Sequence, residues 1–425
     1  MNVGRVIRTV GAHGFGQAIT LVSTLLIPAI AIRSIGPDSF GILLTITGIS
    51  QLLLFADLGI SHSLANHICM LPQARSSEAR ATIIKTRKLA LKYSLISTLV
   101  FFLLSAGYFV FNANTGIEKT DIIVCYILFS ISASLQFTIN LFGAVQRYQD
   151  KPDAAVYFTN ICRLVEVTAL VTAYLLSTNL VVIALCALSA RILTSAIANK
   201  RVNAFINALP HTDNDQSIKD IALAGKGIAL TRTIQHLTLH APVILISAVI
   251  SPTTATLFST TRTLSRLAMQ PISIGIASIQ HEWTMYWARN EQKTFHRLTT
   301  ITLLVSVLTL LATTGITLLF LPQISNAWLS EKLTLSSALF IPAAIAAIAQ
   351  AATLPLTQSL SSINKTKTLA NILMIVTTIS FTVAYMVLAQ TKSAVAMSFC
   401  LAAGEVLLIP LLVNEFRSLL QKHRP

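Results

Sequence analysis

Long runs of apolar residues constrain this chain more than any other feature of its sequence. A helix needs about 20 mostly apolar residues to cross the hydrocarbon core of a bilayer, and about twelve stretches reach this length. Only 11% of the residues are charged, whereas a soluble domain needs roughly a quarter, so a water-soluble globular fold is excluded. The predicted spans are Gly11–Ile32, Phe40–Ile68, Leu89–Phe111, Ile122–Val145, Ala154–Leu176, Leu180–Ala198, Ile221–Ile250, Thr254–Gln280, Leu298–Leu321, Leu333–Leu360, Thr368–Ala389 and Ala394–Asn414.

The basic residues lie mostly on one side of these spans. With both termini in the cytoplasm, the inner segments hold 22 Lys and Arg residues, and the outer segments hold only Arg33, Lys119, Lys332 and Lys392. Lys and Arg are enriched in the cytoplasmic loops of membrane proteins. The net charge of +15 therefore reports topology and does not call for a nucleic-acid partner. We predict an all-α, multi-pass protein of a plasma membrane with both termini cytoplasmic.

Two patterns recur at one offset of 214 residues. Pro28 and Pro242 each lie in an apolar run that leads to a turn with another proline, and the turns around Lys151 and Lys365 also match. These anchors predict a duplicated six-helix unit, and because each copy has an even number of spans, the two lobes run parallel. The two prolines either bend helices beside a substrate path or make packing kinks only. The predicted divisions are an N-terminal lobe over 1–198, a cytoplasmic linker over 199–220 and a C-terminal lobe over 221–425.

Eight ionisable residues lie inside the predicted spans, where a charge is costly and usually faces a cavity or a partner. They are Asp57, Arg163, Glu166, Arg191, Arg232, Arg262, Arg266 and Glu405. Three acids cannot neutralise five arginines, and the guanidinium fork matches the geometry of phosphate. Arg232, His236 and His240 share one helical face, and Arg262 and Arg266 repeat their four-residue spacing in the next span. These patterns predict a cationic cavity for a phosphate-bearing ligand, lined by Arg163, Arg232, His236, His240, Arg262 and Arg266.

Each of these charges also has a simpler interpretation. Arg163 and Glu166 are three residues apart on one helix and could pair with each other, while Arg191 could extend to the membrane interface. Asp57 is either a counter-ion for an arginine or a cation site, and Glu405 has no local partner. The three acids are therefore candidates for charge balance or for coupling to Na+ or H+. No other cofactor is expected.

Signatures of catalysis are missing from the chain. His236 and His240 have metal-ligand spacing, but no acid or cysteine joins them, so no metal site is expected. Gly225 and Gly227 lack the earlier glycine of a phosphate-binding loop. The outer segments are short, which disfavours a membrane sugar polymerase or glycosyltransferase, because such enzymes carry catalytic groups in sizeable loops. The sequence favours a transporter over an enzyme.

The segment 35–65 carries a family resemblance. It reads IGPDSFGILLTITGISQLLLFADLGISHSLA, with a glycine-proline turn, Phe40-Gly41 and then Asp57-Leu58-Gly59. It resembles the opening of the Wzx-type O-antigen flippases of the MATE-like exporter superfamily, and the resemblance extends through 142–150 and 358–367. The resemblance implies a MATE-like flippase fold with about twelve transmembrane helices in two parallel six-helix lobes.

The same resemblance implies a function in lipopolysaccharide biosynthesis or polysaccharide export. Family members move an undecaprenyl-pyrophosphate-linked oligosaccharide from the inner to the outer leaflet of the bacterial plasma membrane through a cation-lined cavity. The implied partners are this lipid-linked glycan, the bilayer, and a polysaccharide polymerase with its chain-length proteins. An ion-coupled multidrug exporter of the same superfamily and a lipid II flippase are the alternatives. The surplus of arginines disfavours the first, whose substrates are commonly cationic.

Overall fold

The described part of the chain is built from helices joined by short connections. The computed structural model describes residues 3–52, 80–88, 92, 118–149, 151–210, 234, 236–329, 332–363 and 366–422, and no strand occurs among them. The helices are α1 (Val3–Leu52), α4 (Lys119–Tyr148), α5 (Pro152–Leu176), α6 (Leu180–Ala208), α8 (Pro252–Ser265), α9 (Met269–Ala288), α10 (Gln292–Leu319), α11 (Leu321–Leu329), α12 (Ser337–Ser362), α13 (Thr366–Thr391) and α14 (Ala394–Lys422). A further apolar helix spans His236–Val249. The predicted all-α fold is confirmed.

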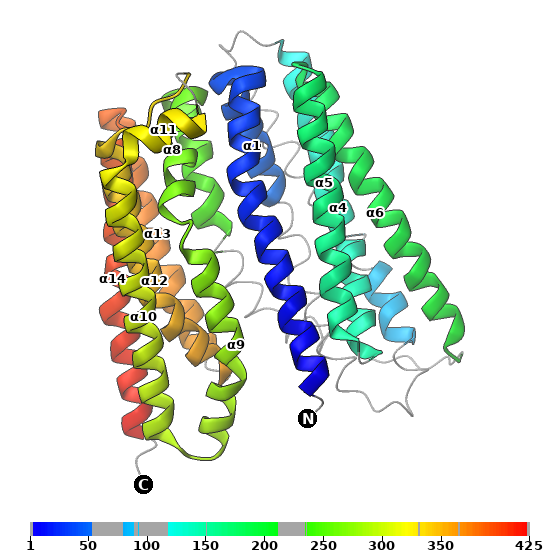
Figure 1. The fold of residues 1–425 in the computed structure, drawn as a ribbon, viewed down its shortest axis with the longest axis vertical. Coiled ribbons are helices and arrows are strands. Elements are labelled where there is room, and N and C mark those ends of the chain that lie inside the picture. The colour runs from blue at the N-terminus through cyan, green and yellow to red at the C-terminus, as the bar shows by residue number, and fades with distance from the viewer. Residues whose placement is uncertain are drawn as a thin grey trace. The chain divides into compact units, whose positions relative to one another are not determined.

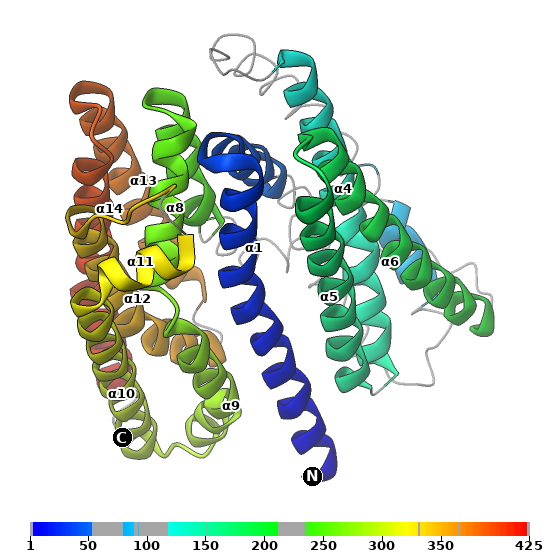
Figure 2. The ribbon, with the colours of Figure 1, turned by 45° about the horizontal axis from the view of Figure 1, so that its top comes forward.

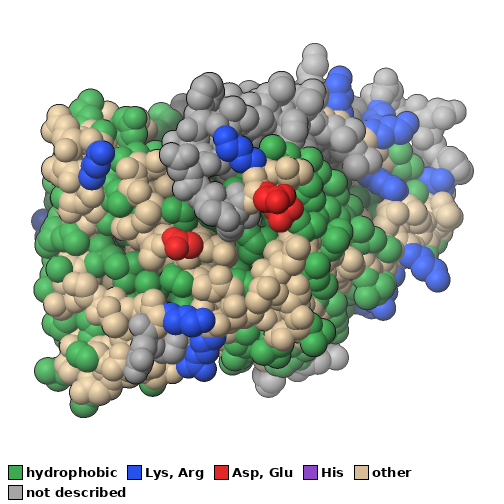
Figure 3. Space-filling model, turned by 90° about the horizontal axis from the view of Figure 1, so that it is seen from above, with side chains coloured by type: hydrophobic (Ala, Val, Ile, Leu, Met, Phe, Trp, Pro, Cys, Tyr) green, Lys and Arg blue, Asp and Glu red, His purple; other side chains and the backbone are tan. Residues whose placement is uncertain are grey.

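Within the described residues, eight helices are long and apolar enough to cross a membrane. Leu304, Val305 and Leu308 on α10 are 53, 56 and 63% exposed, and hydrophobic side chains cover much of the surface in Figure 3. Such extensive apolar exposure indicates a surface in contact with lipid, and the chain is a multi-pass membrane protein. Nearly all of the predicted span Leu89–Phe111, and parts of Phe40–Ile68 and Ile221–Ile250, lie outside the described residues.

Helix ends recur at the predicted offset of 214 residues. Helix α6 covers Leu180–Ala208 and α14 covers Ala394–Lys422, so both ends of the two helices are separated by this offset. Helix α4 ends at Tyr148 and α12 ends at Ser362, again 214 residues later. Unrelated helices would not share both their lengths and their spacing. The matching helix ends support the predicted duplication.

The chain forms two compact units, called unit 1 (Met1–Ile244) and unit 2 (Leu245–Pro425). The division falls within the helix His236–Val249. Helix α6 continues to Ala208 and so extends into the segment predicted as a linker. Because residues 211–220 lie outside the described part, the assignment of 199–220 to a cytoplasmic linker stays a prediction.

Unit 1 is held together by lengthwise packing of α1, α4, α5 and α6 (Figures 1 and 2). A glycine permits the close approach of α1 to α5, because a Cβ atom at Gly16 would lie 2.3 Å from Oδ1 of Asn160. The Nδ2 atom of Asn160 donates a hydrogen bond of 2.7 Å to the carbonyl oxygen of Ala12. Small residues that let two backbones meet, together with an amide bond between helices, are typical of packing in a membrane.

Helix α1 contains a sharp turn between two predicted spans. Gly36 has φ of +83° and ψ of 165°, so the helix is interrupted there. This positive φ is accessible to glycine at little cost, and Pro37 then opens the second helical segment because its ring presets a helical φ. The predicted glycine-proline turn is confirmed. At Pro28 the backbone stays helical, and the choice between a substrate path and a packing role for this proline stays open.

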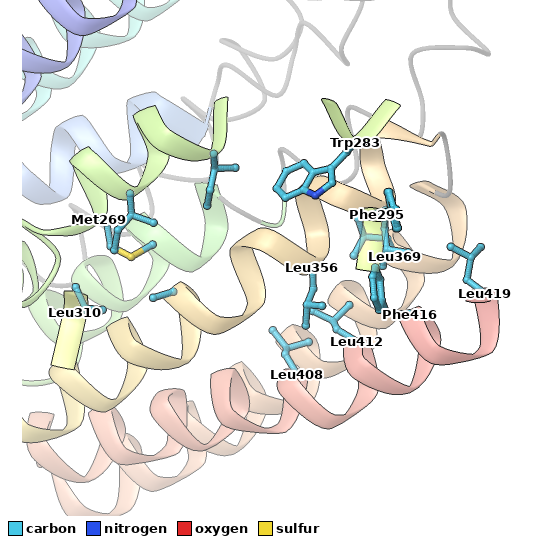
Figure 4. Packing of buried hydrophobic residues seen from close by; sticks show 14 of the residues in the cluster. Met269, Trp283, Phe295, Leu310, Leu356, Leu369, Leu408, Leu412, Phe416 and Leu419 are labelled. Carbon is cyan, nitrogen blue, oxygen red and sulfur yellow. The ribbon is translucent and has the colours of Figure 1, made fainter. Parts of the chain in front are cut away.

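Helix α12 is the central helix of unit 2, where it contacts α8, α9, α10, α13 and α14. Its buried alanines let these neighbours approach closely. At one end of the unit, Trp283, Phe295 and Phe416 fill the space between α9, α10 and α14 (Figure 4). The rings of Phe295 and Phe416 stack with their centroids 5.7 Å apart. Leu356 and Leu360 of α12 belong to the same buried cluster, which therefore joins α12 to α14.

The predicted span Thr254–Gln280 is wrong as a single helix. Helix α8 ends at Ser265, residues 266–268 form a turn, and α9 begins at Met269. Within the turn, the backbone N–H of Met269 donates to the carbonyl of Arg266, a three-residue spacing that tightens the chain. The cause is Pro271, which has no N–H to donate and whose ring clashes with the carbonyl four residues before it. The break leaves Arg266 at the end of α8, close to the middle of the predicted span.

A glycine also controls the contact between α13 and α14. A Cβ atom at Gly404 would lie 2.0 Å from Oγ and 2.6 Å from Cβ of Ser380. We therefore expect Gly404→Ala to force the two helices apart and to cost about 1–3 kcal/mol of unfolding free energy, the usual range for overpacking. The additional change Ser380→Gly should restore most of this loss. The midpoint of thermal unfolding in detergent measures both effects, and equal midpoints for wild type and Gly404→Ala would contradict the expectation.

Candidate functional site

The predicted site residues are divided between the two units. In unit 1, Arg163 and Glu166 lie on α5, while His236 and His240 lie on the helix His236–Val249. In unit 2, the predicted residues are Arg262, Arg266 and Glu405. Asp57 and Arg232 lie outside the described residues, so their predicted roles stay predictions.

An ion pair across two helices dominates the polar interior of unit 1. Nη1 of Arg191 on α6 lies 2.9 Å from Oε1 of Glu166 on α5, and the two side chains are only 14 and 20% exposed. Arg191 also donates to the side-chain carbonyl of Gln136 on α4, and Nε2 of Gln136 donates to Oδ1 of Asn140 at 3.0 Å. We call Gln136, Asn140, Glu166 and Arg191 the N-terminal cluster. Its charges balance and its amide groups are bonded to one another.

This geometry corrects two of the simpler interpretations of the sequence. Glu166 forms its close ion pair with Arg191 on α6 rather than with Arg163 on its own helix. Arg191 is held inside the unit by two partners, so the prediction that it extends to the interface is wrong. Arg163 is exposed and interacts with Glu166 only through its longer-range charge. The predicted place of Arg163 in a substrate cavity stays a prediction.

The charged residues of unit 2 form a second group, which we call the C-terminal cluster (Arg262, Arg266, Gln350 and Glu405). Nε2 of Gln350 on α12 donates to Oε1 of Glu405 on α14 at 2.7 Å. The carboxylate interacts electrostatically with Arg262 and Arg266 on and just after α8, and the guanidinium carbon of Arg262 lies 6.0 Å from the ring centroid of Phe258. The four named side chains together carry two positive charges and one negative charge, so the cluster as described is cationic.

The two clusters occupy equivalent places in the repeat. Gln136 and Arg191 are 55 residues apart in the sequence, as are Gln350 and Glu405, and each member of the first pair precedes its counterpart by 214 residues. An amide on the first helix of each pair, α4 or α12, thus holds an ionisable group on α6 or α14. The charge is reversed between the copies, being positive in unit 1 and negative in unit 2.

Sequence reasoning missed Gln136 and Gln350, although a signal for them was present. Neither residue is ionisable, so neither stands out in an apolar span. Applying the offset of 214 to Arg191 leads to Glu405 and applying it to Gln136 leads to Gln350. The repeat therefore contains the information that relates these pairs, whereas inspection of single helices does not.

The two histidines pack together in unit 1. The rings of His236 and His240 lie 6.2 Å apart and nearly parallel. A Cβ atom at Gly48 would be 3.6 Å from Cβ and Nδ1 of His240, so α1 passes close to this helix. Within the part of the chain that the structure describes, no three side chains of His, Cys, Asp or Glu gather in a way that could hold a metal ion.

Solved structures with the same arrangement of helices are membrane transporters. No protein-family model and no curated protein sequence matches the chain. A multidrug resistance MATE family transporter of the MOP superfamily, in its outward-facing conformation, superposes with a TM-score of 0.71 at 13% identity, over 99% of this chain and 96% of its own. This chain has the fold of a MATE transporter. The inward-facing conformation of such a transporter gives a TM-score of 0.69 at 14% identity over 95% of each chain.

A third solved structure with this fold has a binding pocket of different polarity. It is a MOP superfamily transporter from Pyrococcus furiosus, reported with a binding pocket of reverse polarity that suggests a different function. It superposes with a TM-score of 0.67 at 13% identity, over 99% of this chain and 96% of its own. At such identities the likeness establishes the fold alone and not the substrate.

Proposed function

We propose that this protein moves an undecaprenyl-pyrophosphate-linked oligosaccharide, such as an O-antigen repeat unit, from the inner to the outer leaflet by alternating access. The observation that carries the proposal is the cationic C-terminal cluster, in which Arg262 and Arg266 interact electrostatically with the carboxylate of Glu405 inside a membrane-spanning unit. Buried charges are costly in a membrane and are typically retained where they bind a partner. The guanidinium fork suits a diphosphate.

Membrane potential favours the proposed direction of transport. Moving one elementary charge through 100 mV changes the free energy by about 2.3 kcal/mol. An anion that leaves a cell with a negative interior moves downhill, so the two phosphates of the lipid carrier contribute driving force. Coupling to Na+ or H+ through Asp57, Glu166 or Glu405 is the alternative source of energy. The close pairing of Glu166 with Arg191 makes Glu166 the weakest of these three candidates.

The proposed location is the inner membrane of a bacterium, with both termini in the cytoplasm. The distribution of Lys and Arg over the two sides supports this orientation. The proposed partners are the lipid-linked glycan and a polysaccharide polymerase with its chain-length proteins. In this role the protein binds and moves its substrate without changing it chemically, and the partner enzymes carry out polymerisation.

A multidrug exporter is the second candidate, and the names of two solved structures favour it. Both are multidrug resistance MATE family transporters. Against it stands the sign of the charge in this chain, because two arginines repel a cationic drug. The structure from Pyrococcus furiosus, with its pocket of reverse polarity, supports the idea that this fold accommodates more than one kind of substrate.

Transport in reconstituted vesicles distinguishes the two candidates. We expect the purified protein, placed in liposomes, to carry a polyprenyl-diphosphate-linked sugar to the far leaflet, where an added lectin or glycosidase reaches it. The initial rate should exceed that of protein-free liposomes by at least about 10-fold. Export of ethidium from the same liposomes, without movement of the lipid-linked sugar, would overturn the proposal in favour of the multidrug exporter.

A further inference from the structure

The two repeat-related amides differ in one respect that points to a ligand. In unit 1, both polar atoms of Gln136 are used, since its carbonyl accepts from Arg191 and its Nε2 donates to Asn140. In unit 2, Nε2 of Gln350 donates to Glu405, but its Oε1 is buried and has no hydrogen-bond partner among the described residues. A buried carbonyl without a donor costs free energy. The amide is thus fully bonded in unit 1 and half bonded in unit 2, and the buried atoms left without a hydrogen bond in the N-terminal cluster belong to the ion pair, namely Nε of Arg191 and Oε1 of Glu166.

The orientation of the Gln350 amide follows from its neighbour. A carboxylate offers acceptors only, so the amide nitrogen must face Glu405 and the carbonyl oxygen must face elsewhere. Helix α12, which carries Gln350, contacts both α8 and α14. The carbonyl without a donor therefore belongs to the helix that contacts both α8, which carries Arg262, and α14, which carries Glu405.

Taken together, the C-terminal cluster combines two kinds of hydrogen-bonding group. Arg262 and Arg266 supply only donors, which suit phosphate oxygens, while Glu405 and Gln350 supply acceptors, which suit hydroxyl groups. A bare phosphate needs no acceptors, and a neutral sugar needs no arginines. A ligand that satisfies both sets carries a phosphate joined directly to a carbon skeleton with hydroxyl groups.

We propose that the C-terminal cluster is a glycosyl-phosphate site, in which Arg262 and Arg266 bind the phosphate and Gln350 and Glu405 accept hydrogen bonds from the adjacent sugar. This inference rests on the proposed function and deepens it, because it assigns recognition of the first sugar to unit 2. It gives Glu405 a role in specificity rather than in ion coupling. The balanced N-terminal cluster, by contrast, has a structural role.

Binding of two soluble probes tests the assignment. The full chain in nanodiscs is titrated with α-D-glucose 1-phosphate and, separately, with inorganic phosphate, and the 31P line widths give the two dissociation constants. We expect Gln350→Met to weaken the binding of glucose 1-phosphate by about 5-fold to 10-fold, the effect of one lost hydrogen bond. The dissociation constant for inorganic phosphate should not change. Glu405→Gln should strengthen the binding of inorganic phosphate, because it removes the negative charge that competes for the arginines. The preference for the sugar phosphate over inorganic phosphate should therefore fall.

The matched control is Gln136→Met, the same substitution at the equivalent place in unit 1. It should lower the thermal unfolding midpoint but leave both dissociation constants unchanged. If Gln350→Met weakens the binding of both probes equally, or of neither, the sugar-binding role of Gln350 is overturned, while the anion site and the proposed transport stand. If the wild-type protein binds neither probe at millimolar concentration, the inference and the proposed function both fail. Equal effects of Gln136→Met and Gln350→Met on probe preference would also contradict the inference.

Discussion

Replacing Arg262 and Arg266 together with glutamine is expected to abolish the delivery of glycan to the cell surface. Each arginine is assigned a charge-assisted bond to phosphate, and such bonds contribute about 1.5–3 kcal/mol each. Losing both should weaken substrate binding by at least about 100-fold. The double variant should accumulate lipid-linked glycan in the inner leaflet. Surface glycan measured by immunoblot, together with the amount of protein in the membrane, checks this result.

The matched control removes the same charge from exposed positions. Arg289 and Arg297 flank the turn between α9 and α10 and are exposed, so the Arg289→Gln/Arg297→Gln variant should keep surface glycan near the wild-type level. The conservative Arg262→Lys/Arg266→Lys variant keeps the charge but loses the planar fork, and should retain an intermediate level. Normal surface glycan in the glutamine double variant, at normal protein abundance, would refute the cationic site.

The fold was largely predictable because a bilayer leaves a chain few choices. Backbone polar groups have no water to bond in lipid, so an apolar run of about 20 residues forms a helix. The recurrence of Pro28 at Pro242 gave the offset that the ends of α6 and α14 later matched. Hydropathy does not reveal a local break in a helix. The run 254–280 is apolar enough for one span, but Pro271 prevents a continuous helix, and α8 ends at Ser265.

The partners within the site were harder to predict because they come from different helices. Spacing along one helix paired Arg163 with Glu166, whereas the structure places Arg191 from α6 at 2.9 Å from Glu166. The pair Arg262 and Arg266 was predictable from its spacing, but its link to Gln350 and Glu405 depends on the packing of α12 against both α8 and α14. Tertiary packing decides such contacts, and only the repeat offset carries a trace of them in the sequence.

The substitution Glu166→Gln should strongly destabilise unit 1. It leaves the guanidinium of Arg191 in a mostly buried place without its counter-charge, 2.9 Å from a neutral amide. Breaking a buried ion pair from one side costs about 3–5 kcal/mol. The thermal unfolding midpoint in detergent should fall by several degrees. The exposed Glu118, whose side chain makes no capping bond at the start of α4, provides the control Glu118→Gln, which should shift the unfolding free energy by less than about 0.5 kcal/mol.

Removing both charges separates a structural role for Glu166 from a role in transport. The Glu166→Gln/Arg191→Gln double variant leaves no unpaired charge, so it should recover most of the lost stability. If the pair only holds α5 to α6, this variant should also transport lipid-linked glycan at close to the wild-type rate. A double variant that is stable but inactive would instead restore the coupling role that the sequence suggests for Glu166, because stability and transport would then depend on different properties of one carboxylate.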